Sequence, residues 1–211
     1  MREVLFENQC YKEFENSDEG NQWGWEYFKD VLTPDENPAF ESVFFYTGSM
    51  SRIWNRVLRR NPPIESGEFE IRAKNEFLSG TDQIQRILDV NSVLQKHNIP
   101  ENIVVYRYTD KKVVKKLCST YILRRGMQFK DKGFLSTTLV SKLLVSFAKK
   151  HDYNCLLKIY VPKGTRGAYV SIKHPLAKLN EQEILLPPNS QMEIVKVHRF
   201  SNPFLIECKI V

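Results

Sequence analysis

The sequence of 211 residues contains no long apolar run, no paired cysteines and no tract of like charge. No stretch approaches the roughly 20 apolar residues of a membrane span, and residues 1–20 have no apolar core of a secretion signal, so we expect a soluble chain. The four cysteines are scattered, with no CxxC pair and no histidine at ligand spacing. They therefore predict free thiols and no metal site.

Several common active-site motifs are also missing. There is no GxSxG, no glycine-rich phosphate loop, and no histidine spacing typical of a metal site or a nucleophilic triad. The commonest hydrolase and triphosphatase classes are thereby excluded. The net charge of +6 suits an anionic ligand, an acidic protein or nucleic acid without choosing among them. Because no five lysines or arginines are consecutive, a nucleic-acid partner is not indicated.

The pattern of apolar residues changes near residue 100 and predicts one α+β domain over residues 1–211. Residues 1–100 are mainly helical, with helices expected to begin at 33–36, to span 50–60, and to run from Thr81 to about 97. After Pro100, short apolar runs between turn signals predict strands, with one helix at about 140–150. The expected strands are 102–109, 133–138, 155–161, 167–171, 183–186, 191–198 and 204–211. We expect the helical half to pack on two sheets that lie face to face.

Two strands carry polar side chains of chemical interest. Arg107 lies in the apolar run VVYRYT, and a guanidinium placed there needs an anionic partner because it keeps its proton. Taken alone, it also fits a surface arginine at a strand end. Ser136, Thr137 and Thr138 end the run GFLSTT, where hydroxyls can orient a neighbouring side chain. Serine and threonine are common in strands, so this run gains weight only from its position in the chain.

A third feature is the pair Glu181 and Glu183, directly before ILLPP. In an extended chain these side chains share one face, and two carboxylates on one face are tolerated best when a cationic substrate lies between them. The same spacing occurs at residues 13–15 and 68–70, both in regions we expect to be helical. The position after a Gly/Lys-rich loop and downstream of the arginine and serine strands distinguishes the third pair.

Taken in order, these elements form a known pattern. Tyr106-Arg107, then the run 133–138, then the run 181–186 (EQEILL) resemble the mono-ADP-ribosyltransferase toxins of bacteria, especially the Rho-modifying exoenzymes and the enzymatic components of binary actin-modifying toxins. The run YTGS from Tyr46, followed by Asn55, is similar to the family's helix beside the NAD cleft. The resemblance covers about residues 40–200. It implies the two-sheet β-sandwich core of the ADP-ribosyltransferase fold, with NAD as substrate and no metal.

The resemblance also implies catalytic roles. Glu183 would bind the nicotinamide ribose and stabilise its oxocarbenium-like centre, much as carboxylates do in glycosidases. Ser136 would place Glu183, and Glu181 would orient the acceptor and help to remove its proton. In this family a glutamate at the first position accompanies arginine acceptors and a glutamine accompanies asparagine-type acceptors. The expected enzyme is an NAD-dependent protein-arginine mono-ADP-ribosyltransferase, which is a glycosyltransferase.

The same resemblance implies contacts to NAD. Arg107 would hold the pyrophosphate, where a planar fork of donors suits paired anionic oxygens. Phe147 would pack against the nicotinamide. The remaining expected cofactor-binding residues are Tyr46, Asn55, Tyr106, Thr137 and Thr138. Relatives carry an aromatic residue shortly before the first glutamate, whereas this chain has Ala177 to Asn180 there.

The resemblance further implies a target protein with an accessible arginine, of which host actin and small GTPases are the family's examples. A secreted bacterial toxin or virulence effector is expected, active in the cytosol of a host or target cell and served by a separate delivery component. Three alternatives stay open: an NAD glycohydrolase using the same site, a catalytically silent binding module on the same fold, and transfer to nucleic acid. Dependence on Glu181 separates transfer from hydrolysis, because water needs far less orientation than a guanidinium.

Overall fold

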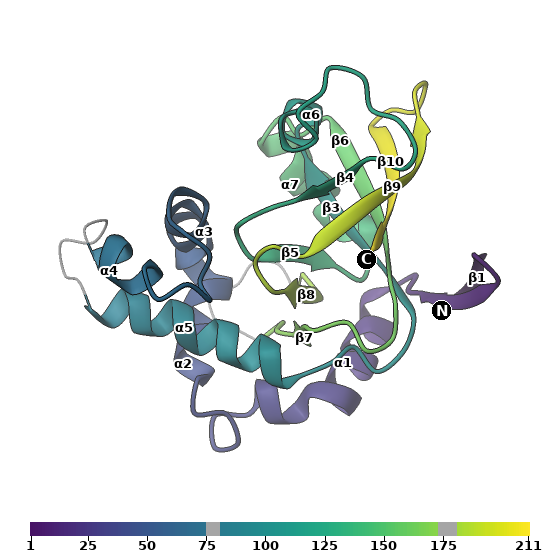
Figure 1. Ribbon diagram of the computed structural model, residues 1–211. Coiled ribbons are helices and arrows are strands. Elements are labelled where there is room, and N and C mark those ends of the chain that lie inside the picture. The colour runs from purple at the N-terminus through teal and green to yellow at the C-terminus, as the bar shows by residue number, and fades with distance from the viewer. Residues whose placement is uncertain (75–80, 173–180) are drawn as a thin grey trace.

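The computed structural model describes residues 1–74, 81–172 and 181–211, without the side chains of Thr81, Leu144 and Phe147. Helices dominate up to residue 96 and strands dominate after residue 102 (Figure 1). The helical elements are α1 (Ser17–Leu32), α2 (Phe40–Phe45), a π-helical turn (Tyr46–Met50), α3 (Ser51–Arg60), α4 (Phe69–Ala73), α5 (Thr81–Lys96), α6 (Lys111–Leu117), a 3-10 turn (Ser141–Leu144) and α7 (Val145–Lys150). The strands are β1 (Arg2–Phe6), β2 (Gln9–Glu13), β3 (Ile103–Thr109), β4 (Gln128–Lys130), β5 (Leu135–Thr138), β6 (Cys155–Val161), β7 (Ala168–Tyr169), β8 (Glu183–Leu186), β9 (Gln191–His198) and β10 (Phe204–Ile210).

The predicted α+β class is confirmed, and the strands form two parts that join at one residue pair. The hydrogen-bonded order is β4-β9-β10-β6-β3-β5-β8-β7. Strand β3 pairs with β6 along seven residues but with β5 only through Tyr106 and Thr138. The two expected sheets are therefore one continuous hydrogen-bonded path, with a narrow junction between β3 and β5.

Two expectations for the N-terminal half are wrong. Residues 2–13 form the β1–β2 hairpin instead of a helix, so the Glu-x-Glu at 13–15 begins in a strand. No helix begins at 33–36. Helix α1 ends at Leu32, and the next residue, Thr33, is extended because a proline at the following position disfavours helical geometry in the residue before it. The amide groups of Glu36 and Asn37 both donate to the Thr33 carbonyl and close a turn there.

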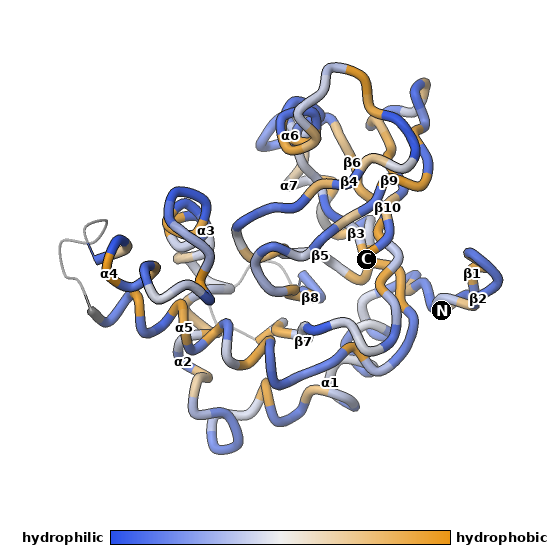
Figure 2. Tube along the Cα trace, viewed as in Figure 1, coloured by the Kyte–Doolittle hydropathy of each residue, from blue (hydrophilic) through white to orange (hydrophobic). Residues whose placement is uncertain are grey.

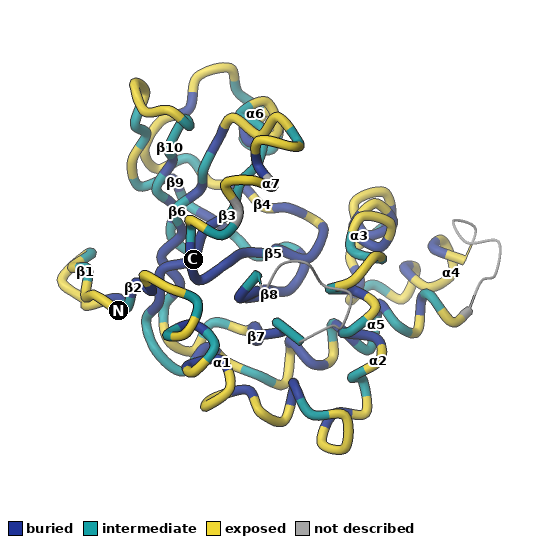
Figure 3. Tube along the Cα trace, turned by 180° about the vertical axis from the view of Figure 1, so that it is seen from behind, coloured by how far each residue is buried: buried dark blue, intermediate teal, exposed yellow. Residues whose placement is uncertain are grey.

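Helices α1 and α5 cover the strands that follow. Helix α5 alternates hydrophilic and hydrophobic residues along its length (Figure 2), and Ile84, Ile87 and Leu94 on its predicted apolar face are buried. Helix α1 packs directly on β7 at Gly24, where an added Cβ would lie 2.4 Å from the ring of Tyr169. Strands β5 and β8 are buried in the middle of the molecule, with helices on the side of β7 (Figure 3). This packing positions the start of β8.

No helix in the described ranges is long and apolar enough to cross a lipid bilayer.

Candidate active site

The junction between the two parts of the sheet brings the predicted site residues together. Tyr106 of β3 pairs with Thr138 of β5, and Thr138 in turn pairs with Glu183 of β8. Residues far apart in the sequence therefore lie in one row across three neighbouring strands. The site is built from the C-terminal end of β5, the N-terminal end of β8 and the middle of β3.

Glu183 is a buried carboxyl group at the start of β8, with 5% of its surface exposed. Burial raises its pKa to about 7, and the negative charge of Glu181 acts in the same direction. A hydrogen bond from the Ser136 side chain and the positive charge of Arg107 lower the pKa in part. Near neutral pH the group is therefore poised between its neutral and ionised forms.

The segment between the two glutamates is not extended as expected. Gln182 has a φ of +41°, in the left-handed region that non-glycine residues seldom adopt. Its side chain is fully buried and donates to Asn21 of α1 (3.2 Å). The turn directs Gln182 into the helical layer. The charge of Glu181 still raises the pKa of Glu183, so the two carboxylates are electrostatic neighbours despite the turn.

Glu181 is partly buried, and burial raises the pKa of its carboxyl group. Its backbone carbonyl accepts a hydrogen bond from the Thr138 hydroxyl (2.5 Å). The Thr137 hydroxyl donates to the carbonyl of Ile184 (2.8 Å). Both threonine hydroxyls, which we expected to contact NAD, thus connect β5 with β8 and with Glu181 just before it.

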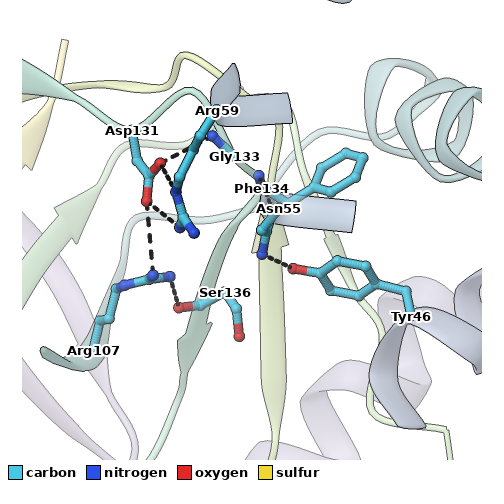
Figure 4. Close-up of polar contacts among 8 residues, drawn as sticks. All are labelled: Tyr46, Asn55, Arg59, Arg107, Asp131, Gly133, Phe134 and Ser136. Atoms are coloured by element: carbon cyan, nitrogen blue, oxygen red, sulfur yellow. Dashed lines mark hydrogen bonds and ion pairs between the residues drawn. The ribbon is translucent and has the colours of Figure 1, made fainter. Parts of the chain in front are cut away.

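Arg107 has the anionic partner that its position in an apolar strand predicts. Its Nη1 donates to the carbonyl of Ser136 (2.9 Å), and its Nη2 lies 3.8 Å from the Asp131 carboxylate (Figure 4). The side chain keeps 22% of its surface exposed. Some of its donors are therefore still available to a ligand.

Asp131 binds a second guanidinium, that of Arg59 at the end of α3. The Nε and Nη2 atoms of Arg59 each lie 2.7 Å from a different carboxylate oxygen, and the amide of Gly133 donates to the same carboxylate (3.0 Å). Burial acts to raise the Asp131 pKa, but the hydrogen bonds and charge of Arg59, together with the charge of Arg107, more than offset it and hold the pKa below its usual value. Figure 4 shows both arginines directed toward this one carboxylate.

We did not expect a role for Asp131 from the sequence. The available signal was its position at the turn directly before GFLSTT, two residues ahead of Gly133. Arg59 lies four residues after Asn55 on the same helix, and no sequence spacing connects it with Asp131. Because Arg59 and Arg107 share one buried carboxylate, this part of the site has an excess positive charge. We call it the cationic corner, and it is suitable for binding an anion.

Asn55 and Tyr46 form the wall behind this cluster. The Asn55 side chain accepts from the amide of Phe134 (2.7 Å) and donates to the Tyr46 hydroxyl (3.0 Å). The Tyr46 ring is fully buried and meets the Phe134 ring edge to face, with centroids 5.3 Å apart. These contacts, drawn in Figure 4, fasten α3 to the loop before β5.

Tyr106, one of the predicted residues, does not join this cluster. The ring of Tyr106 packs with Tyr11 and Tyr160 in a separate apolar cluster, on the face of β3 opposite to Arg107. Phe147 lies in α7, but its side chain is outside the described residues, as are Ala177 to Asn180 before the first glutamate. In the described parts of the chain, no group of three or more His, Cys, Asp or Glu residues is arranged to hold a metal ion.

A buried carboxyl group of raised pKa under the influence of an arginine, on this α+β fold, is the arrangement that the resemblance implies for an ADP-ribosyltransferase. A family model described as ADP-ribosyltransferase exoenzyme matches residues 20–203. The chain belongs to this family, and the resemblance stated for its sequence is confirmed.

Individual relatives agree with the family. The chain is 25% identical to mono-ADP-ribosyltransferase C3 of Clostridium botulinum C phage, over 87% of this chain and 73% of that protein. It is also 25% identical to the epidermal cell differentiation inhibitor of Staphylococcus aureus, over 88% of this chain and 77% of that protein. The fold is similar to that of C3stau2 from S. aureus, solved with NAD, with a TM-score of 0.69 at 20% identity over 95% of this chain and 98% of that one. The protein is thus a mono-ADP-ribosyltransferase of the C3 exoenzyme type.

Proposed function

We propose that this protein transfers ADP-ribose from NAD to an arginine side chain of a target protein and releases nicotinamide. The observation that carries the proposal is the pair Glu181 and Glu183. Burial raises the pKa of both carboxyl groups, and the charge of Arg107, which together with Arg59 forms the cationic corner, acts on Glu183. Glu183 stabilises the ribose as nicotinamide leaves, and Glu181 orients a cationic acceptor.

The cationic corner fits the pyrophosphate of NAD. The fork of donors on a guanidinium matches paired anionic oxygens, and Arg107 retains exposed donors. Arg59 keeps 43% of its side chain exposed although it binds Asp131. Arg107 is accordingly assigned to the pyrophosphate, as the family resemblance implies, and Asp131 holds the Arg59 guanidinium in orientation. This fit supports NAD as substrate, in agreement with the solved relative that contains NAD.

Glu183 acts in the step that breaks the bond between the ribose carbon and the nicotinamide nitrogen. The ionised carboxylate stabilises the positive charge that develops on the ribose as nicotinamide leaves with the bonding electrons. Ser136 donates a hydrogen bond to that carboxylate and favours its ionised form. The reacting form is therefore the one that predominates above pH 7.

Glu181 acts on the acceptor. An arginine guanidinium is protonated at working pH and becomes a nucleophile only when it loses a proton. Glu181 orients the guanidinium, and its raised pKa makes it a stronger base than an ordinary carboxylate. A nitrogen of the guanidinium then forms the new bond to the ribose carbon, and the proton passes to Glu181. Water as acceptor needs no such orientation.

The other assignments follow from the same site. Tyr46, Asn55, Thr137 and Thr138 support NAD binding by holding α3, β5 and β8 in place, and Phe147 packs on the nicotinamide. The target is a protein with an accessible arginine, with host actin or a small GTPase as candidates. The enzyme acts after export from a bacterium, in a target cell, with a separate delivery component.

The experiment is incubation with labelled NAD and a cell lysate, comparing wild type with Glu183→Gln, Glu181→Gln and the control Glu70→Gln. Glu70 belongs to the Glu-x-Glu at 68–70 and is exposed on α4, so the control removes the same kind of charge elsewhere. Wild type and control label protein bands that hydroxylamine removes and mercury does not, which is the pattern of an arginine linkage. Glu183→Gln loses both labelling and nicotinamide release, while Glu181→Gln loses the hydroxylamine-sensitive labelling and keeps part of the release.

Other outcomes contradict the proposal. Nicotinamide release by wild type without a labelled product indicates an NAD glycohydrolase. Label that nuclease removes indicates a nucleic-acid acceptor. Neither product from a folded protein indicates a catalytically silent module.

A further inference from the structure

One end of the molecule, remote from β8, carries two segments that expose large apolar side chains. The segment between α6 and β4 exposes Tyr121 (90%) and Ile122 (50%), and the turn between β9 and β10 exposes Phe200 completely (103%). Both segments lie at the same end of the molecule from the front and from behind (Figures 1 and 3). Clustered apolar exposure on an otherwise polar surface marks an interaction site.

Exposed cations flank these apolar side chains. Arg124 and Arg125 follow Tyr121 and Ile122 in the sequence. Lys196 and Arg199 both precede Phe200. All four are exposed. None of the four takes part in an ion pair within the ranges that the structure describes. They contrast with Lys209, Lys158 and Arg2, which bind carboxylates elsewhere on the sheet.

Two shallow grooves connect the segments. They share Leu123, Val197 and Arg199, so they form one continuous surface. Six cations line them: Lys111, Lys115, Arg124, Arg125, Lys196 and Arg199. Glu207 is the single carboxylate among the described lining residues, and it already binds His198 (2.6 Å) and the hydroxyl of Tyr160 (2.7 Å). The described residues that line this surface therefore carry an excess of positive charge, with no free carboxylate among them.

We propose that this surface, defined by residues 121–125 and 196–200, docks on an anionic lipid bilayer. Aromatic side chains are stable at the boundary between headgroups and acyl chains, and cations beside them are attracted to lipid phosphates and carboxylates. A bilayer fits better than an acidic protein because Phe200 lines neither groove and stands fully in solvent. A protruding side chain enters a fluid apolar layer without needing a preformed pocket. The inference does not depend on which acceptor the enzyme modifies.

The test is cosedimentation of the full chain with vesicles. We expect binding to vesicles of phosphatidylcholine mixed with phosphatidylserine, and little binding to phosphatidylcholine alone. High salt should weaken the binding, because it screens exposed charges. Labelling activity in solution is not needed for this readout, so failure of the proposed arginine transfer would leave it interpretable.

Two variants and two matched controls locate the binding. The double variant Arg124→Glu/Arg199→Glu should bind anionic vesicles at least about 30-fold more weakly. Phe200→Ser should weaken binding about tenfold. The controls Arg52→Glu/Arg56→Glu on α3 and Ile71→Ser on α4 make the same changes at exposed positions elsewhere and should bind like wild type. Circular dichroism checks that each variant is folded.

A probe at the tip separates insertion from surface attraction. Phe200→Trp should keep the binding, and its fluorescence should shift to the blue with anionic vesicles as the ring leaves water. An unshifted spectrum overturns the insertion of this turn. Equal binding to neutral and anionic vesicles, or equal losses in the controls, overturns the proposed surface. Retention on immobilised polyglutamate without any vesicle binding assigns the surface to an acidic protein instead.

Discussion

The hydroxyl of Thr138 donates a hydrogen bond to the backbone carbonyl of Glu181, 2.5 Å away, while the backbone of Thr138 pairs with Glu183. One residue of β5 therefore holds both glutamates of the Glu-x-Glu motif. The hydroxyl also accepts from the amide of Val140 (3.3 Å), which begins the segment leading to α7. A change at this hydroxyl should act on the glutamates without touching a substrate.

The first prediction concerns Thr138→Val, which removes the hydroxyl and keeps the shape. We expect a loss of about 1–3 kcal/mol in the free energy of unfolding, because the carbonyl of the partly buried Glu181 and the buried amide of Val140 lose a partner. Transfer to arginine should fall more than NAD hydrolysis, since Glu181 is displaced while Glu183 keeps its place in the strand. Urea unfolding and the two activities measured side by side check this. Equal losses of both activities would contradict the separate role of Glu181.

The second prediction is the pH dependence of the reaction. Burial raises the pKa of Glu183 to about 7, and the ionised form is the one that stabilises the ribose. We therefore expect kcat/KM for NAD hydrolysis to fall as the pH drops below 7 and to level off above it. Hydrolysis is the better readout because it does not involve an arginine acceptor. A profile that is flat from pH 5 to 8 would show that this carboxylate is not required in its ionised form.

The third prediction follows from the same group but concerns stability. Because the folded-state pKa of about 7 lies above the ordinary glutamate value of 4.5, ionising Glu183 costs folding free energy. The contribution of protonated Glu183 to the free energy of unfolding is fully present below the unfolded-state pKa. It is lost as the pH rises through 7, and the free energy of unfolding then falls by about 3 kcal/mol, at about 1.4 kcal/mol per pKa unit. Glu183→Gln should therefore unfold at higher urea than wild type at pH 8 and at similar urea at pH 4. A variant less stable than wild type at pH 8 would argue against the cost of ionisation.

Much of the strand-rich half was predictable from the sequence. Strands 155–161, 183–186 and 191–198 have the predicted bounds, because apolar runs there end at clear turn residues. The β1–β2 hairpin was missed since its turn contains Glu7 and Asn8, both at positive φ, instead of the glycine that usually marks such turns. Its acidic surroundings made the segment look like part of a helical region.

The site was predictable in its order along the chain but not in its contacts. Arg107 could be chosen because a charged residue in an apolar strand needs an anionic partner. Ser136 and Glu183 could be chosen because they follow Arg107 in the order of the family pattern. The pairing of Asp131 with Arg59 joins residues that no spacing rule connects, and it depends on how α3 packs against the loop before β5. The left-handed turn at Gln182 depends likewise on a tertiary contact with α1.

The fourth prediction tests the carboxylate shared by two arginines, with Asp131→Asn. Removing its charge leaves Arg59 and Arg107 without their partner, so we expect a loss of about 2 kcal/mol at neutral pH, moderated by the exposure of Arg59. The pKa of Asp131 is held below its usual value, so its contribution is present above the unfolded pKa of 3.8 and is lost as the pH falls below it. The difference between wild type and variant should therefore shrink in acid. Urea unfolding at pH 7 and pH 3 measures it, and a constant difference would contradict the ionic origin.

The fifth prediction is that replacing Gly133 disturbs the wall of the site. An added Cβ would lie 2.7 Å from the Asn55 side-chain oxygen, closer than Cβ atoms normally approach a neighbour, so Gly133→Ala must displace Asn55. That breaks its bonds to Phe134 and Tyr46 and loosens α3, which carries Arg59. We expect a loss of about 2–3 kcal/mol in stability and a weaker affinity for NAD, measured by urea unfolding and calorimetry.

Gly67→Ala is the matched control, because its Cβ would meet nothing within 4 Å. Equal behaviour of the two variants would mean that the close approach at Gly133 is not what holds the wall of the site.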